Sequence, residues 1–147
     1  MFKIFKKIKK LKHLLLSIIF EKRTIISLNS TKIGLDIVKS FQKVKYKGFS
    51  QTDKKILNLL NEYRLELRRN IKKINFDEIG LKKNISVSEI VLKASSSEKW
   101  NYFFYELSKI NYINNVLEIG TNLGVSGQYF LKAIDKKKNT KFITIEG

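Results

Sequence analysis

The stretch Val116-Leu-Glu-Ile-Gly-Thr-Asn-Leu-Gly-Val-Ser-Gly127 joins a short apolar run to a glycine-rich segment. Val116, Leu117 and Ile119 predict a strand that is buried on both faces of a parallel sheet, because such strands are nearly continuous in aliphatic residues. Gly120 ends this strand, and a second glycine follows four residues later, which predicts a tight loop. The sequence is therefore expected to fold around this stretch as an α/β protein.

A helix and a second strand follow the loop. The helix is predicted from apolar residues at helical spacing, which are Tyr129, Phe130, Ala133 and Ile134. The polar run 135–140 separates this helix from a β-prone run, Phe142 to Ile145, which ends on Glu146. A β-loop-α-β unit with a glycine-rich first turn and a carboxylate after the second strand is typical of sites for nucleoside cofactors.

The charges around the loop favour one kind of cofactor. A helix N-terminus leaves backbone N–H groups unpaired, and glycine lets a ligand approach the backbone closely. Glu146 could accept hydrogen bonds from both hydroxyls of a ribose. Glu118, two residues before the first glycine, would repel a pyrophosphate, but it would attract the ammonium and sulfonium of S-adenosylmethionine. The G-x-G-x-x-G pattern of dinucleotide sites is also incomplete here.

These residues resemble the class I S-adenosylmethionine-dependent methyltransferases. Val-Leu-Glu118-Ile-Gly120-Thr121-x-x-Gly124-x-Ser126 is similar to their first motif, and Ile143-Thr-Ile-Glu146-Gly147 is similar to the end of their second strand. The resemblance implies a Rossmann-like sheet that binds S-adenosylmethionine. Its implied cofactor-binding residues are Glu118, Gly120, Thr121, Asn122, Gly124, Ser126 and Glu146.

The resemblance also assigns roles within this set. It implies that Glu118 lies near the methionine amino group, that Gly120 and the following loop face the methionine portion, and that Glu146 binds the ribose hydroxyls. The sequence departs from the family at two positions. Asn122 stands where many relatives have a glycine, and Gly127 stands where threonine is commoner.

A looser similarity reaches back to about Phe49, through the segment Phe76-Asp-Glu-Ile-Gly80 and through Trp100. It implies that the segment, expected to be extended, precedes the catalytic domain and folds over cofactor and substrate. Asp77 and Glu78 are therefore candidates for a contact with the substrate.

The predicted function is methyl transfer from S-adenosylmethionine to an oxygen or nitrogen of a small or saccharide-like acceptor. Two alternatives remain. One is a nicotinamide-dependent Rossmann oxidoreductase. The other is a basic adaptor that binds membrane or nucleic acid, in which the glycines only form a tight turn and the αβ unit is structural.

The motif lies near the C-terminal end of the sequence, which leaves room for only part of the predicted sheet. A doubly wound sheet needs about five or more strands, yet the first predicted strand begins near Val116 and the second ends at Glu146. We therefore expect the sequence to be the N-terminal part of a longer protein, with an incomplete sheet. A catalytic base and most of the acceptor site would then lie in the remainder, so no catalytic residue is assigned and this part alone is expected to be inactive.

Three regions are predicted: a basic helical region at 1–48, a helical region at 49–110, and the start of a Rossmann-like cofactor-binding domain at 111–147. Within the first two regions, hydrophobic periodicity predicts helices at 1–20, 31–44, 51–74 and 86–93, with a loop around Asn29 and Ser30. The helix at 51–74 is expected to begin with Thr52 as its N-cap. Its expected apolar face consists of Ile56, Leu59, Leu60, Tyr63 and Leu67.

One more helix is predicted just before the first strand. Ser95 and Glu98 have the spacing of a capping box, in which Ser95 would be the N-cap. The apolar stripe of this helix is expected to pack in the core, and it consists of Trp100, Phe103, Phe104 and Leu107. A cofactor-stacking role for Trp100 is the alternative.

The formal net charge is +17, and 13 of the 30 Lys and Arg residues lie in the first 50 positions, against only Glu21 and Asp36. Residues 1–20 combine lysines with an apolar stripe at helical spacing, which predicts a basic amphipathic helix that could contact an anionic membrane surface. Nucleic acid is a second candidate partner for this charge, and a biased composition without any anionic partner is the alternative.

The sequence also limits the chemistry and the location of the protein. There is no cysteine and a single histidine, His13, far from the motif, so no disulfide and no zinc cluster is expected. No secretory signal or spanning segment is recognised in the sequence. We therefore expect a cytoplasmic protein, whose residues 1–20 could lie at the inner face of the membrane. The sequence does not indicate an oligomeric state.

Overall fold

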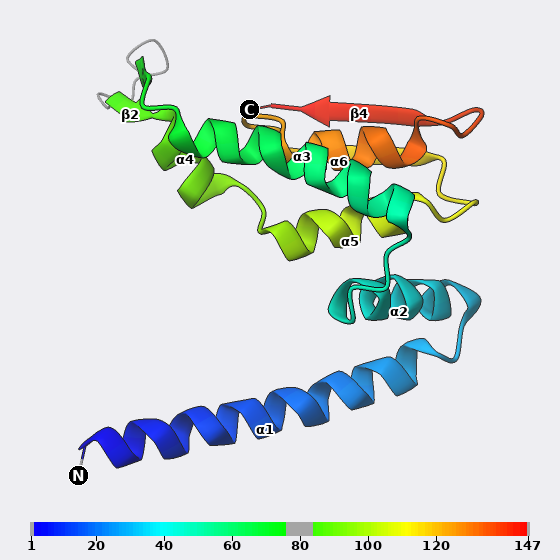
Figure 1. Ribbon diagram of the computed structural model, residues 1–147. Helices are drawn as coiled ribbons and strands as arrows, with labels where there is room; N and C mark the ends of the chain where they lie inside the picture. The colour runs from blue at the N-terminus through cyan, green and yellow to red at the C-terminus, as the bar shows by residue number, and fades with distance from the viewer. Residues whose placement is uncertain (1, 76–83, 147) are drawn as a thin grey trace. The chain divides into compact units, whose positions relative to one another are not determined.

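The computed structural model describes residues 2–75 and 84–146, with side chains from residue 10 onwards (Figure 1). The chain divides into two compact units, Met1–Gln42 and Lys43–Gly147. It is a mixed α/β protein, which confirms the predicted class. The segment predicted to be extended at 76–80, with Asp77 and Glu78, lies outside the described residues. No helix in the described part of the chain is both long and apolar enough to cross a bilayer.

The first unit contains α1 (Phe2–Leu28) and most of α2 (Lys32–Lys45). The predicted end of α1 at residue 20 was therefore wrong. The charged residues that follow Phe20 continue the helix, since nothing before Asn29 breaks it: the chain has no proline and no glycine precedes position 34. The loop at 29–31 and the second helix are confirmed, and the Oγ1 of Thr31 accepts a hydrogen bond from the N–H of Gly34 at 3.0 Å.

Helix α3 (Gln51–Arg69) opens the helical part of the second unit. Its N-cap is Ser50 rather than the predicted Thr52, because the Oγ of Ser50 accepts a hydrogen bond from the N–H of Asp53 at 3.0 Å. The helix ends five residues before the predicted residue 74. After it, the Oδ1 of Asn70 accepts from the N–H of Lys72 at 2.9 Å, a local turn that competes with further helix.

A small hairpin that the sequence analysis did not predict follows α3. Strand β1 (Lys73–Asn75) pairs antiparallel with β2 (Asn84–Ser86). Ser86 is also the N-cap of α4 (Val87–Ala94), in a capping box with Glu89. The predicted short helix at 86–93 is thus confirmed.

Helix α5 (Glu98–Ser108) begins after Ser97, so the predicted capping box of Ser95 with Glu98 was wrong. Ser95 instead ends α4 as its C-cap, where its N–H donates to the carbonyl of Val91 at 3.3 Å. The residue was already part of the preceding helix end and was not available as an N-cap.

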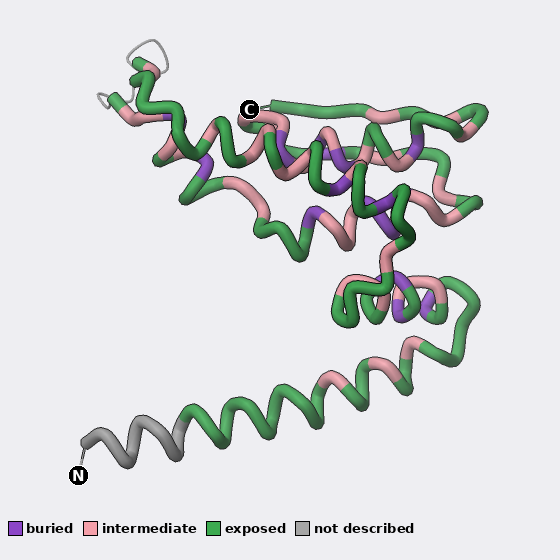
Figure 2. Tube along the Cα trace, viewed as in Figure 1, coloured by how far each residue is buried: buried purple, intermediate pink, exposed green. Residues whose placement is uncertain are grey.

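The core of the second unit lies between α3, α5 and α6 (Val125–Ile134), and it is formed around Leu57, Tyr105 and Tyr129 (Figure 2). The predicted core stripe of α5 was wrong for Trp100, which is 58% exposed. The buried face of α5 consists of Asn101, Tyr105, Glu106 and Ser108. Neighbouring positions of a helix are rotated by about 100°, so Asn101 is buried where Trp100 was predicted. In α3 the predicted Leu59 is exposed, and Leu57, two positions earlier, is buried.

Tyr129 provides a test of this core. Its side chain is fully buried, no hydrogen-bond partner for its hydroxyl lies among the described residues, and burial raises the pKa of the phenol to about 12. We expect Tyr129→Phe to change the free energy of unfolding by less than about 1 kcal/mol, because removing an unpartnered buried hydroxyl recovers its desolvation cost. Urea unfolding measures this change.

Tyr105→Phe is the matched control, since the hydroxyl of Tyr105 donates to Asp53 at 2.9 Å. It should cost about 1.5–3 kcal/mol, the usual range for a hydrogen bond to a charged group. Equal losses for the two variants would show that the hydroxyl of Tyr129 does have a partner.

Strand β3 (Asn115–Ile119), α6 and β4 (Lys141–Ile145) form the predicted β-loop-α-β unit. The strands pair in parallel, with Val116 opposite Phe142 and Ile119 opposite Ile145. Helices cover one side of this sheet (Figure 1). The predicted burial of the first strand on both faces was wrong: the side chains on the other face are more than half exposed, and they are Leu117, Ile119, Ile143 and Ile145. In the described part of the chain no element covers that face, and side chains alternate along a strand.

Candidate functional site

The backbone of the loop between β3 and α6 adopts a conformation that only a few residue types tolerate. Gly120, Asn122 and Gly124 all have positive φ angles, of 78°, 51° and 69°. Glycine adopts this conformation without strain, and asparagine tolerates it better than most residues. The backbone at position 122 is therefore one that asparagine or glycine can adopt. Gly124 is also the N-cap of α6, so the loop leads directly into a helix N-terminus.

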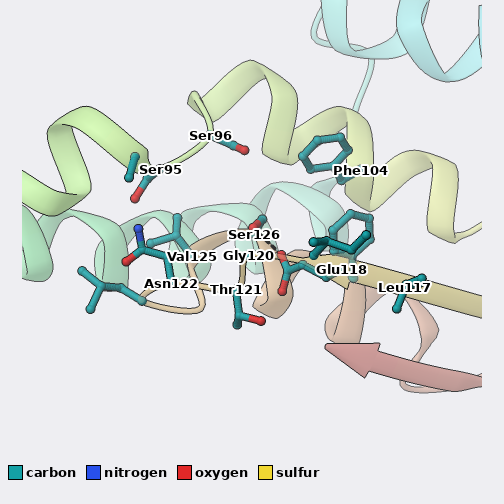
Figure 3. Close-up of a pocket in the computed structure, with 14 residues that line it drawn as sticks. Ser95, Ser96, Phe104, Leu117, Glu118, Gly120, Thr121, Asn122, Val125 and Ser126 are labelled. Carbon is teal, nitrogen blue, oxygen red and sulfur yellow. Dashed lines mark hydrogen bonds between the residues drawn. The ribbon is translucent and has the colours of Figure 1, made fainter. Parts of the chain in front are cut away.

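A pocket of about 380 Å³ lies beside this loop (Figure 3). Such a volume falls within the range of about 300–1,000 Å³ that is usual for small-molecule sites. The loop and the end of β3 form one wall, and the α4–α5 connection with one residue of α5 forms the wall across from it. The lining residues are Ala94, Ser95, Ser96, Phe104, Leu117, Glu118, Ile119, Gly120, Thr121, Asn122, Leu123, Val125, Ser126 and Phe130.

Glu118 brings a buried negative charge to the pocket wall. Glu118 is only 8% exposed, and its Oε1 accepts a hydrogen bond from the Oγ of Ser126 at 2.5 Å. Its Oε2 is buried, and no donor for it lies in the described part of the chain. A Cβ on Gly127 would come within 3.0 Å of this oxygen, so the absence of a side chain at 127 leaves room for the carboxylate. An unpartnered carboxylate oxygen in such a place suits a cationic ligand.

Glu146 has a different position. It is exposed, it is not among the lining residues, and its Oε2 accepts a hydrogen bond from the N–H of Asn122 at 2.7 Å. The carboxylate after β4 therefore holds the loop without lining the pocket. Gly124 also lies outside the lining, whereas the other predicted cofactor-binding residues line the pocket: Glu118, Gly120, Thr121, Asn122 and Ser126.

The sequence analysis missed the wall across from the loop. Ser95 and Ser96 were assigned to helix capping or not considered, and Phe104 was assigned to the core. Phe130 also lines the pocket, but it was used only as one of the apolar positions that predict α6. The rings of Phe104 and Phe130 stack with centroids 5.0 Å apart, and Trp100 stacks on Phe104 from outside the pocket at 6.2 Å. The cofactor-stacking alternative for Trp100 thus has no support from the pocket geometry.

A second missed residue is Tyr63 of α3, whose hydroxyl donates to the carbonyl of Leu123 at 3.1 Å. This bond ties the loop to a helix 60 residues earlier in the sequence. No local pattern could have indicated it. Tyr63 and Glu146 thus each hold the loop by one hydrogen bond.

Comparison of the chain with models of known protein families, with curated protein sequences and with solved structures found no match. Among the described residues, no group of three histidine, aspartate or glutamate side chains is arranged to hold a metal ion.

Proposed function

We propose that the pocket beside residues 120–124 binds S-adenosylmethionine and that the protein takes part in methyl transfer to an oxygen or nitrogen of a small or saccharide-like acceptor. The observation that carries the proposal is the buried carboxylate of Glu118, whose Oε2 has no donor among the described residues. The ammonium group of the methionine moiety would provide such a donor and would also neutralise the buried charge.

The remaining residues of the pocket fit the other parts of this cofactor. The positive φ angles of Gly120 and Asn122 turn the backbone of the loop. Gly120 has no side chain, so the space in front of the loop stays open at this position. The aromatic rings of Phe104 and Phe130 offer an apolar wall for a flat base, and the hydroxyls of Ser95 and Ser96 offer donors and acceptors.

The cofactor supplies a methyl group that its sulfonium already activates. The contribution of the protein is then mainly alignment, because the acceptor atom must lie in line with the bond that breaks. Glu118 would hold the methionine end in one orientation, while Tyr63 and Glu146 keep the loop in place.

The role of Glu146 can be tested by substitution. We expect Glu146→Ala to weaken S-adenosylmethionine binding by about tenfold, because it removes the bond that holds the N–H of Asn122 in the loop, and with it the carboxylate that we propose to accept from the ribose hydroxyls. Isothermal titration calorimetry measures the affinity. Asp135→Ala, which removes an exposed carboxylate at the opposite end of α6, is the matched control and should leave the affinity unchanged. Unchanged affinity in Glu146→Ala would rule out a part for this carboxylate in the site.

Titration with different cofactors tests the proposal as a whole. S-adenosylmethionine and S-adenosylhomocysteine, which share the ammonium group, should both bind, and NAD should not, because its pyrophosphate would face Glu118. Binding of NAD alone would favour a nicotinamide-dependent oxidoreductase. Binding of none of the three would leave the αβ unit with a structural role.

A further inference from the structure

Helix α1 carries an apolar stripe that is open to solvent. Within its described side chains, leucines and isoleucines recur at intervals of three and four residues, which places them along one side of the helix. They are 44–58% exposed, and they are Leu11, Leu14, Leu15, Ile18 and Ile19. We call these five residues the α1 stripe. Exposed apolar side chains in a contiguous set mark a surface that binds something.

The positive charge around the α1 stripe indicates what kind of surface it binds. Residues 2–23 contain eight lysine and arginine residues and a single acidic residue, Glu21. Lys10 and Lys12, next to Leu11, are exposed. A surface that joins an apolar stripe to dense positive charge is complementary to an anionic bilayer, whose acyl chains accept the stripe and whose headgroups attract the lysines.

Two other partners match only part of this surface. A second copy of α1 could cover the stripe, but it would bring the same excess of positive charge alongside and would be repelled. Nucleic acid would neutralise the lysines through its phosphates, but this binding does not use an apolar stripe. The bilayer satisfies both features at once.

We propose that α1 binds an anionic lipid surface, lying along it with the α1 stripe in the boundary between headgroups and acyl chains. This function is independent of the cofactor pocket, which lies in the other unit. It would hold the protein at a membrane.

Vesicle sedimentation with the full chain tests the proposal. The protein should sediment with vesicles of phosphatidylcholine mixed with phosphatidylglycerol, but not with vesicles of phosphatidylcholine alone, and added salt should weaken the binding. The double variant Leu11→Gln/Leu15→Gln should bind the anionic vesicles roughly 100-fold more weakly, because two leucines no longer enter the apolar layer. Glutamine preserves the charge and the helix propensity.

The matched control is Leu16→Gln/Phe20→Gln, which removes two exposed apolar residues outside the α1 stripe. Its vesicle affinity should stay within about threefold of the unmodified chain, since these side chains point away from the lipid. The proposal is overturned if the chain does not sediment with anionic vesicles, or if the two double variants lose vesicle affinity equally. It is also overturned if a short RNA is bound while vesicles are not, or if the α1 stripe instead dimerises the chain in lipid-free buffer.

Discussion

Replacing Asp53 with asparagine should lower the free energy of unfolding by about 3–5 kcal/mol, the usual effect of removing one partner from a buried ion pair. The carboxylate of Asp53 is almost fully buried. Its Oδ1 accepts hydrogen bonds from the Nζ of Lys109 at 2.8 Å and from the hydroxyl of Tyr105 at 2.9 Å. Its Oδ2 accepts from the Oγ of Ser50 at 2.8 Å.

The effect is large because Asp53 belongs to a cluster of alternating charges. Glu106 is equally buried, and the Nζ of Lys43 lies 2.8 Å from its Oε2 and 3.4 Å from the Oδ2 of Asp53. Lys109 also reaches both carboxylates. Asparagine would leave two lysines facing a single carboxylate in a poorly solvated place, so the cluster would carry an unbalanced positive charge.

Chemical unfolding of the variant measures this loss. Asp135→Asn is the matched control, since Asp135 forms a surface ion pair with Lys132 at 3.2 Å and its side chain is 57% exposed. The control should change stability by less than about 0.5 kcal/mol. Equal effects of the two substitutions would show that the buried cluster contributes no more than a surface pair.

Asp53 should also make the stability of the fold depend on pH. Burial alone would raise the pKa of Asp53, but the hydrogen bonds from Lys109, Ser50 and Tyr105 outweigh it and hold the pKa well below its usual range. Since the folded pKa lies below the unfolded value, the ionised carboxylate stabilises the fold at neutral pH, and this contribution is lost as the pH falls below about 4. The difference in stability between the unmodified chain and Asp53→Asn should therefore shrink below that pH.

The second large effect concerns Glu118. We expect Glu118→Gln to weaken S-adenosylmethionine binding by roughly 100-fold, because a hydrogen bond between two charged groups in a poorly solvated site contributes more than one at the surface. Glutamine keeps the size of the side chain and can still accept from the Oγ of Ser126. The stability of the cofactor-free protein should stay the same or rise, since a buried charge is removed.

These two readouts separate a binding role from a structural one. Calorimetric titration gives the affinity, and chemical unfolding without cofactor gives the stability. Glu62→Gln, at an exposed position of α3, is the control for the loss of one negative charge and should change neither. A Glu118→Gln variant that lost stability while keeping its affinity would assign the carboxylate to the fold alone.

Local patterns in the sequence predicted the β-loop-α-β unit well. The strand, the glycine loop, the helix and the second strand each depend on residues that are neighbours in the chain, and all four are present. Where two local signals competed, the prediction was wrong. Ser95 fits the start of one helix and the end of another, and a local pattern does not show which helix takes it. Trp100 and Leu59 are apolar at helical spacing, yet tertiary packing placed the neighbouring positions in the core.

In the candidate site, too, features set by neighbouring residues could be predicted, and features set by tertiary contacts could not. Glu118 and the loop residues could be predicted because they lie within one short motif. The bond of Tyr63 to Leu123 could not be predicted, and neither could the bonds of Asp53 to Tyr105 and of Glu106 to Lys43, since each joins residues more than 50 positions apart in the chain. The pattern of residues alone also does not reveal that Glu146 binds the N–H of Asn122 and lies outside the pocket lining.

The central claim is that residues 118–126 form a site for S-adenosylmethionine, and an NMR titration of backbone amides tests it most directly. Adding the cofactor to the labelled chain should shift the amide resonances of Gly120 to Ser126, together with those of Ser95, Ser96 and Phe104 across the pocket. Resonances of α1 should stay in place. A spectrum in which these pocket amides do not move at saturating cofactor, or in which only α1 responds, would contradict the account.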